Sequence, residues 1–254
     1  MRFLKLTLCY DGTRYAGWQV QKEAPTIQAE LEQAWYKVTR ETIRATASGR
    51  TDAGVHSLGQ VVSLQTESAL AGDVLQCALS ANLPEDIVVL AVDDAPDGFH
   101  AIRDAVRKRY RYQIHNGAAP DVLQRHVTWH VPTPLDAEAM QRAGGALRGT
   151  HDFSSFETSG AERATSVRTV TDLSVARGSV ERDTGERKDR ITIEVEADGF
   201  LYNMVRTIVG TLVEVGRGAE DETWPADVLR ACDRRKAGPT APPQGLILVN
   251  VDYR

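Results

Sequence analysis

The stretch with the strongest chemical signature is the loop SGRTDAGVH, residues 48–56. Gly49 and Gly54 permit tight backbone turns on either side of Asp52. An aspartate between glycines at a strand end is exposed, and Arg50, two positions earlier, favours its ionised form. These features make Asp52 a candidate nucleophile or base. The alternative is a plain turn in which the Asp52 carboxylate caps the following residues, and spacing alone favours that turn.

The same loop argues against two other kinds of site. It lacks the GxxxxGK[ST] spacing of a phosphate-binding loop. His56 has no second histidine or cysteine near it, so we expect a packed or hydrogen-bonded side chain and no metal. The three cysteines, Cys9, Cys77 and Cys232, lie far apart without CxxC spacing, which favours free thiols in a reducing cytoplasm over a zinc site.

A second candidate site is the strand RKRYRYQI, residues 107–114. Successive side chains of a strand point to opposite faces. One face would carry Lys108, Tyr110, Tyr112 and Ile114, and the other Arg107, Arg109 and Arg111. An aromatic face backed by an arginine face can stack a base and hold a phosphate backbone. A half-buried strand with tyrosines in the core and arginines in solvent fits the pattern equally well.

The third candidate is an apolar helix, expected over residues 200–215, whose polar positions share one narrow face. These positions are Asn203, Arg206, Thr207 and Gly210. A single arginine on so apolar a helix either reaches solvent or has an acidic partner, and the pattern does not decide between them.

Length and composition set the limits within which these sites must work. The chain has 254 residues, 42% of them hydrophobic and 26% charged, which is ordinary for a globular protein. No apolar run approaches the roughly 18 residues that a membrane span requires, and the N-terminus is too short and polar for a signal peptide. The net charge of −5 alone counts against nucleic-acid binding, but RDAVRKRYR, residues 103–111, is a local basic stretch. A second charged stretch, ERDTGERKDR at 181–190, cancels to zero and predicts a solvated hairpin tip around Thr184 and Gly185.

Two blocks of strands and helices must position the candidate residues. The first is expected to contain strands over 2–10, 43–48, 60–66 and after Asp86, a helix that begins at Ile27 with Thr26 as N-cap, and a helix over 70–80. The second is expected to contain a strand from Arg107, a helix that begins at Thr133-Pro134, strands over 164–177 and 189–197 that pair as a hairpin, helices over 200–215 and 225–235, and a final strand GLILVNVDY. This order predicts two α+β domains with mostly antiparallel sheets: 1–105 with the Asp52 loop, and 106–254 with the tyrosine strand and the Arg206 helix.

Eight motifs, taken together and in order, resemble the tRNA pseudouridine synthase A family. They are YDGTRYAGWQVQ, SGRTDAGVHSLGQVV, ANLPEDI, FHA, KRYRYQI, HDFSSF, FLYNMVRTIVGTLVEVG and GLILVNVDY. The resemblance covers essentially the whole chain. It implies the pseudouridine synthase fold, with two similar α/β sandwich-like domains and an active-site cleft between them. It also implies a cytoplasmic enzyme that isomerises uridine to pseudouridine in the tRNA anticodon stem-loop, at tRNA positions 38, 39 and 40. The implied partners are tRNA and a second copy of the chain, with no DNA, no membrane, no cofactor and no metal.

The resemblance also assigns roles to five residues. Asp52 becomes the catalytic aspartate and Arg50 its loop partner, while Tyr110 becomes the residue that stacks on the target base. Arg206 becomes the ion-pair partner of Asp52, and Leu246 an apolar wall of the pocket.

One position departs from the family pattern. After FHA the family usually has arginine, whereas here Ile102 stands at that position and Arg103 follows.

The chemistry fits these residue types. Isomerisation breaks the N1–C1′ bond, rotates the uracil and joins C5 to C1′, with no redox step. A carboxylate could add to the ring, bond to C1′ or act as a base, and the sequence leaves all three open. A stacked uridine must be flipped out to be reached, and Arg206 would keep Asp52 anionic in the desolvated pocket.

Two other functions compete with this interpretation. A hydrolytic N-glycosylase with Asp11 as a second acid would release free uracil. A non-catalytic RNA-binding module would need the tyrosines and the basic stretch, but not Asp52.

Overall fold

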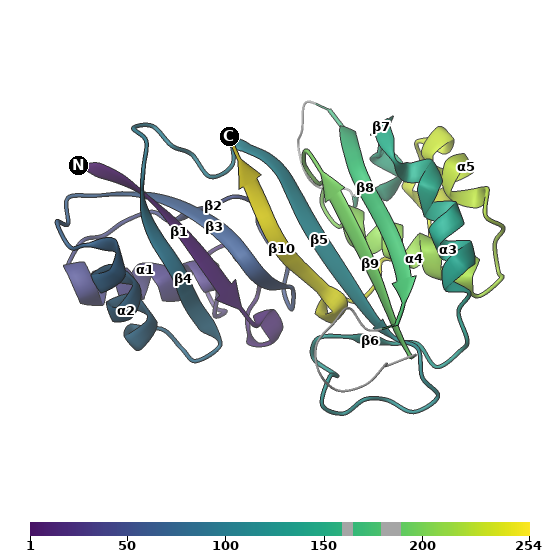
Figure 1. Ribbon diagram of the computed structural model, residues 1–254, viewed down its shortest axis with the longest axis horizontal. Coiled ribbons are helices and arrows are strands. Elements are labelled where there is room, and N and C mark those ends of the chain that lie inside the picture. Colours follow the sequence, from purple (N-terminus) through teal and green to yellow (C-terminus); the bar gives the residue numbers. More distant parts are fainter. Residues whose placement is uncertain (159–164, 179–188) are drawn as a thin grey trace. The chain divides into compact units, whose positions relative to one another are not determined.

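Strands and helices alternate along the chain in the computed structural model, which is mixed α+β with mostly antiparallel strand pairs, as predicted (Figure 1). The structure describes residues 1–158, 165–178 and 189–254. They divide into a first unit, 1–106 together with 247–254, and a second unit, 107–246. The last eight residues therefore fold with the N-terminal part of the chain, a return that no pattern in the sequence indicates.

The first unit is a sheet with two helices on one face. Its strands follow the order β4-β1-β3-β10, with antiparallel pairs except for β3 and β10, which pair in parallel, and the short β2 pairs with β3. The strands are β1 (Arg2–Tyr10), β2 (Thr46–Ala47), β3 (His56–Thr66), β4 (Ile87–Ala95) and β10 (Leu246–Tyr253). The helices are α1 (Ile27–Thr39) and α2 (Gly72–Asn82).

The core of this unit lies between the helices and the sheet. Alternate residues of β1, Leu4, Leu6 and Leu8, are buried in one cluster with side chains from both helices. This alternation is why the sequence pattern predicted β1 with its observed ends. Thr26 caps α1, as predicted, because its hydroxyl accepts a hydrogen bond from the Ala29 amide at 3.3 Å.

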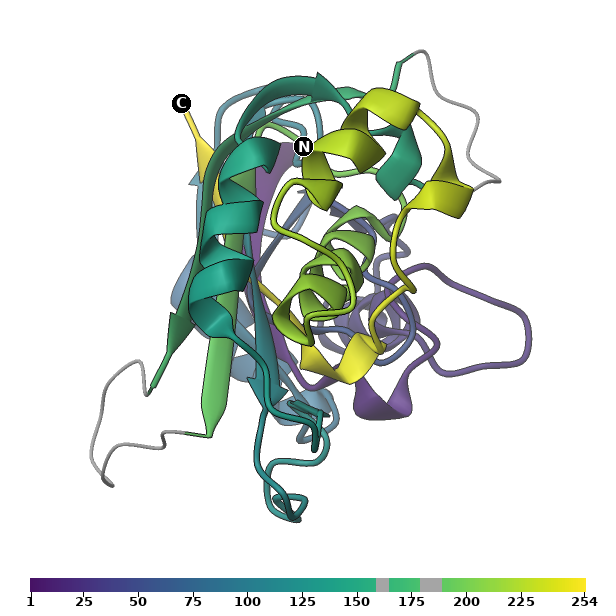
Figure 2. The ribbon, with the colours of Figure 1, turned by 90° about the vertical axis from the view of Figure 1, so that its right-hand side faces the viewer.

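The second unit has a sheet in the order β5-β9-β8-β7, and the short β6 pairs in parallel with β5. Its strands are β5 (Ala105–His115), β6 (Trp129–His130), β7 (Gly149–Asp152), β8 (Val167–Arg177) and β9 (Arg190–Ala197). Its helices, which Figure 2 turns toward the viewer, are α3 (Ala137–Gly144), α4 (Met204–Gly216) and α5 (Trp224–Ala231). The predicted pairing of β8 with β9 is confirmed, whereas the predicted charged tip around Thr184 and Gly185 lies outside the described residues.

Several element boundaries differ from the sequence prediction, and the contacts of two of them show why. The predicted start of α3 at Thr133-Pro134 is wrong: Asp136 is the N-cap, because its carboxylate accepts hydrogen bonds from two amides of the first turn. The Thr133 carbonyl instead accepts a hydrogen bond from the side chain of Asn116. Strand β3 begins at His56 rather than near residue 60, because His56 and Ser57 already pair with β10.

Within the described part of the chain, no helix is both long enough and apolar enough to cross a bilayer.

Candidate active site

The Asp52 loop connects β2 to β3 in the first unit. Asp52 is half-buried, and its carbonyl accepts a hydrogen bond from the Val55 amide at 3.1 Å, which closes a tight turn. Gly54 in this turn has a φ of +77°, a conformation that suits glycine. The glycine spacing noted in the sequence thus corresponds to an observed turn.

The segment from Asp11 to Trp18 packs against this loop backbone to backbone. The Trp18 amide donates a hydrogen bond to the Thr51 carbonyl at 3.0 Å. Gly17 comes so close that a Cβ atom there would lie 2.5 Å from the same carbonyl oxygen, and its φ is +93°. Gly12 makes a similar approach to the Val55 carbonyl, where a Cβ would lie 2.0 Å away. The two glycines of YDGTRYAGW are therefore required by close packing against the candidate catalytic loop.

His56 is a packed and hydrogen-bonded histidine, as predicted. Its side chain is buried, and Nδ1 lies 3.1 Å from the Gly12 amide and 3.0 Å from an Asp11 carboxylate oxygen. One ring nitrogen serves one of these partners at a time: unprotonated it accepts from Gly12, and protonated it donates to Asp11. The Asp11 carboxylate also accepts the Thr13 amide, so Asp11 shapes the start of the packed segment. No group of potential metal ligands occurs among the described residues.

Arg50 differs from the other candidate residues because its side chain is open to solvent. It is exposed, and it has no hydrogen bond or ion pair with any residue in the described ranges. A guanidinium in this situation is available for an external anion such as a phosphate.

The aromatic face of β5 belongs to the core of the second unit. Tyr112 and Ile114 are fully buried, and Tyr110 is 8% exposed. The Tyr110 ring meets Phe200 edge to face, with ring centroids 4.9 Å apart. The Tyr112 hydroxyl donates to the Pro242 carbonyl at 2.7 Å, and burial raises the pKa of Tyr112 far above its ordinary value. The prediction of tyrosines in the core thus holds for Tyr112, whereas Tyr110 is buried except for 8% of its surface.

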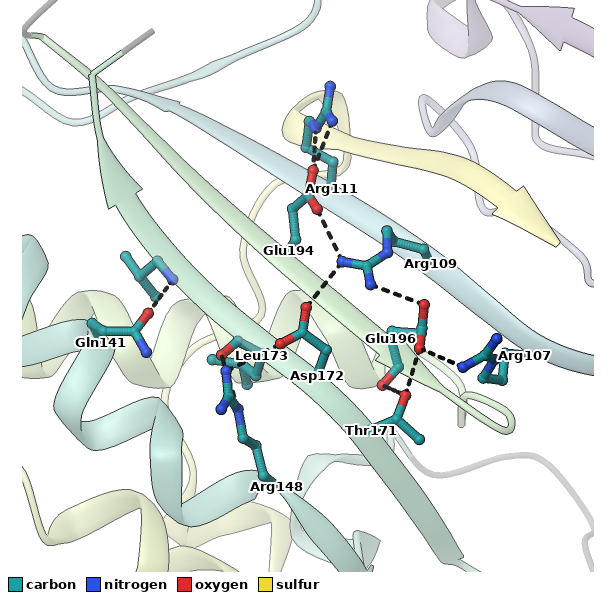
Figure 3. A network of polar contacts seen from close by, with 11 residues as sticks. Arg107, Arg109, Arg111, Gln141, Arg148, Thr171, Asp172, Leu173, Glu194 and Glu196 are labelled. Atoms are coloured by element: carbon teal, nitrogen blue, oxygen red, sulfur yellow. Dashed lines mark hydrogen bonds and ion pairs between the residues drawn. The ribbon is translucent and has the colours of Figure 1, made fainter. Parts of the chain in front are cut away.

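The arginine face of β5 is neutralised by acidic side chains of the neighbouring strands β9 and β8 (Figure 3). Arg109 contacts Asp172, Glu194 and Glu196 at 2.9 to 3.1 Å. Arg111 pairs with Glu194 at 2.7 Å, and Arg107 with Glu196 at 3.5 Å. The expectation that these arginines hold a phosphate backbone conflicts with this network, because their charges are already compensated.

Glu196 shows how strongly the network is coupled. Burial alone would raise the pKa of Glu196, but the Thr171 hydroxyl and the Arg109 guanidinium outweigh it and hold that pKa below its ordinary value. At Arg109, desolvation would lower the pKa, but the carboxylates of Asp172, Glu194 and Glu196 outweigh it and raise that pKa. The arginine face therefore contributes to stability above the ordinary pKa of a glutamate, and this contribution is lost as the pH falls through the lowered pKa of Glu196.

Arg206 on α4 is fixed by two hydrogen bonds within the second unit. Its Nε donates to the Ala241 carbonyl at 2.7 Å and its Nη1 to the Asn203 side-chain oxygen at 2.8 Å. The Ala241 amide returns a bond to the Arg206 carbonyl at 3.0 Å. Asn203 itself has a left-handed backbone, with φ of +61°, at the start of the helix.

The narrow polar face of α4 is covered by the segment 238–241. A Cβ at Gly210 would lie 1.7 Å from the Pro239 carbonyl oxygen, and the Gly238 amide donates to the Thr211 hydroxyl at 3.0 Å. The absence of a side chain at Gly210 thus allows the chain to approach closely enough to bond Arg206. This explains a glycine in the middle of an otherwise apolar helix.

Leu246 lies at the end of the same segment. It is buried, and the preceding Gly245 packs on the Tyr112 ring, where a Cβ would lie 2.5 Å from the ring carbons. Arg206, Leu246 and the tyrosine face are therefore connected through residues 241–246. Their predicted contacts with RNA, and the pairing of Arg206 with Asp52, stay predictions.

The chain resembles several known proteins over its full length. The family model described as tRNA pseudouridine synthase matches residues 8–103 and 143–254. A protein named tRNA pseudouridine synthase A from Moorella thermoacetica is 48% identical over 257 residues, and one of the same name from Acetivibrio thermocellus is 47% identical over 254. A third of that name, from Thermoanaerobacter sp. (strain X514), is 46% identical over 255 residues, and each alignment covers 100% of both chains. The chain belongs to the tRNA pseudouridine synthase family.

Family membership makes the protein an enzyme of the isomerase class, and its α+β fold agrees with the expected pseudouridine synthase fold. Tyr110 lies between the two matched segments, in a part that the full-length relatives cover. At the position where the sequence departs from the family pattern, Arg103 bonds the Gly98 carbonyl at 2.7 Å and Asp104 at 3.1 Å. These contacts hold Arg103 along its own loop beside the exposed Ile102.

Sequence reasoning missed two residues that contact the Asp52 loop directly, Tyr10 and Gln60. Both are buried polar side chains that bond residues of the loop. The available signal was a side chain with a hydrogen-bonding group at an inward-facing position in each of the strands β1 and β3.

Proposed function

We propose that the protein converts uridine to pseudouridine in the anticodon stem-loop of tRNA, at tRNA positions 38, 39 and 40, with Asp52 as the catalytic residue. The observation that carries the proposal is full-length similarity to relatives named tRNA pseudouridine synthase A. The firmly held Asp52 turn supports the choice of residue, because a reactive carboxylate must be held in a defined geometry.

The reaction balances without a cofactor. The N1–C1′ bond of the uridine breaks, the freed uracil turns, and C5 bonds to C1′. N1 gains a proton and C5 loses one, so the product is an isomer of the substrate. The Asp52 carboxylate can act by addition to the ring, by bonding to C1′ or as a base on the sugar, and all three require its ionised form.

The other site residues have supporting roles in this proposal. Tyr110 stacks on the flipped base with its ring face, and Leu246 forms an apolar wall. Arg206 pairs with Asp52 and keeps it anionic in a pocket from which water is excluded. Arg50, which has no partner among the described residues, contacts RNA phosphate and helps to open the stem.

The partners and location in the proposal follow from the substrate. The protein acts in the cytoplasm, where tRNA is found, and binds tRNA as a homodimer. No cofactor or metal takes part.

Purified protein and unmodified tRNA test the proposal. Pseudouridine at positions 38 to 40, with no free uracil in the medium, is the expected result. Free uracil would instead indicate the hydrolytic N-glycosylase with Asp11 as second acid. Binding without any change in the tRNA would indicate an RNA-binding module.

A further inference from the structure

A buried hydrogen-bond network lies directly beneath the Asp52 loop, and its centre is Gln60 of β3. Gln60 is fully buried, and its side-chain amide makes three hydrogen bonds in this region. Its Nε2 donates to the Gly49 carbonyl at 2.9 Å and to the Tyr10 hydroxyl oxygen at 3.3 Å. Its Oε1 accepts the Ser48 hydroxyl at 2.7 Å.

Tyr10 of β1 extends the network to the residue before Asp52. Its hydroxyl lies 2.8 Å from the Thr51 hydroxyl, and both side chains are buried. Either hydroxyl can donate in this bond, because each can also accept. Burial raises the pKa of Tyr10 to about 12, so the phenol stays protonated at neutral pH.

The network bonds the loop at Ser48, Gly49 and Thr51. Arg50 lies between Gly49 and Thr51, and Asp52 directly follows Thr51. Gln60 and Tyr10 come from two adjacent, antiparallel strands: Leu8 pairs with Gln60 and Tyr10 with Ser57, and the register shifts between these two pairs. The packed segment on the other side of the loop bonds the Thr51 carbonyl through Trp18. Thr51 is thus held at two points: Tyr10 bonds its side chain, and Trp18 bonds its backbone carbonyl.

We propose that Gln60 and Tyr10 are positioning residues for the isomerisation, which fix the backbone on either side of Arg50 and set the position of the Asp52 carboxylate. This inference rests on the proposed role of Asp52. Neither residue is assigned a reacting atom. Their effect is on the rate of the chemical step, because a displacement of about 1 Å in a catalytic group can cost on the order of a hundredfold in rate.

The test replaces Gln60 by methionine and compares it with the same change at a matched position. Gln28 on α1 is also a buried glutamine of the first unit, 2% exposed, and it bonds Glu32, the Ala45 carbonyl and the Val20 amide, none of them in the loop. Gln60→Met should lower the single-turnover rate of pseudouridine formation by about a hundredfold and leave the Kd for tRNA within about threefold of the parent. Gln28→Met should lower the melting temperature but keep the single-turnover rate of the folded enzyme.

A second pair of variants preserves the test if Gln60→Met does not fold. Thr51→Val removes the hydroxyl that Tyr10 bonds and keeps the side-chain shape, whereas Thr51→Ser keeps the hydroxyl and removes a methyl group. The single-turnover rate should fall strongly in Thr51→Val and recover in Thr51→Ser, with tRNA affinity unchanged in both. A merely structural network would give rates that follow the melting temperature, with no recovery specific to serine.

The inference is overturned if folded Gln60→Met keeps the parental rate, or if Thr51→Val and Thr51→Ser are equally active. Different results would contradict the proposed function: no pseudouridine formation by the parent protein, or full activity of Asp52→Asn. The parent and Asp52→Asn are therefore measured first in the same assay.

Discussion

Arg50 and Arg109 show why residue type alone could not assign RNA contacts. The sequence presents both as basic residues of candidate sites, yet Arg109 is surrounded by three carboxylates and Arg50 has no partner in the described ranges. The acids come from Asp172, Glu194 and Glu196, more than 60 residues further along the chain. Only the strand order places them beside the arginines, so the sequence could predict the basic strand but not its neutralisation.

The two arginines should respond in opposite ways to substitution. Arg50→Ala should weaken tRNA binding without changing the melting temperature. The slope of log Kd against log salt concentration should fall by about one, the value for the loss of one phosphate contact. Arg109→Gln should leave the salt dependence unchanged and reduce the free energy of unfolding by about 2 kcal/mol, between the values for exposed and buried ion pairs. Binding titrations at several salt concentrations, together with thermal melts, measure both. If only Arg109→Gln lost tRNA affinity, Arg109 rather than Arg50 would be the residue that contacts phosphate.

Tyr110 is the residue at which packing and function must be separated. Tyr110→Phe keeps the ring against Phe200 and should keep tRNA binding, whereas Tyr110→Ala should lose roughly 1–3 kcal/mol of stacking. Removal of a core ring also costs stability, typically about 3–5 kcal/mol, so tRNA affinity is measured well below the melting temperature of each variant. Equal affinities of the two variants would show that the ring does not stack on a base.

At the scale of elements, local signals predicted those strands and helices whose ends are decided locally. The alternating leucines gave the observed ends of β1, and the Thr26 cap gave the start of α1. Boundaries decided by distant contacts were missed. Strand β3 starts early because β10 pairs with it. The start of α3 is an exception: it is decided locally, but the pattern favoured Thr133 over Asp136, which accepts the first-turn amides.

The close contact between α4 and the segment 238–241 gives a prediction at this scale. Gly210→Ala would place a methyl group where the Pro239 carbonyl lies, so the segment must move and its bonds to Arg206 must lengthen. We expect a loss of about 1–3 kcal/mol in the free energy of unfolding and a lower rate of pseudouridine formation.

Gly145→Ala is the matched control for Gly210→Ala. Gly145 has a helical backbone, and a Cβ there would meet no atom within 4 Å. This change should be neutral or stabilise by about 0.4–1 kcal/mol, with an unchanged rate. If Gly210→Ala is as stable and as active as Gly145→Ala, the contact does not position Arg206.

At the scale of the whole molecule, charge bears on how an acidic protein binds tRNA. The net charge is −5, and the arginine face of β5 is compensated by its neighbours. A single copy with this charge is poorly suited to a long polyanion, whereas two copies related by a two-fold axis would double the number of cationic contacts. The sequence predicted two α+β blocks, but not that residues 247–254 return to the first unit, because strand pairing across the full chain length leaves no local pattern.

Sedimentation equilibrium tests the proposed homodimer. We expect a dimer at about micromolar protein, and we expect the dimer to be the species that binds tRNA, because neutralisation of more phosphates strengthens binding. Sedimentation of the tRNA complex gives the stoichiometry. A monomer that binds tRNA tightly at the same concentration would contradict the proposed homodimer.

The role of Asp52 in the isomerisation is tested by tritium release from tRNA that contains C5-labelled uridine, since C5 loses its hydrogen when it joins C1′. Asparagine has nearly the shape of aspartate without its charge or nucleophilicity. Asp52→Asn should therefore fold and bind tRNA as well as the parent or slightly better, since a negative charge near phosphate is removed, and it should release no tritium. Asp52→Glu should also be nearly inactive, because a displacement of about 1 Å can cost on the order of a hundredfold in rate. Substantial tritium release by Asp52→Asn would contradict this assignment and move the catalytic role to another carboxylate, with Asp11 the first to test.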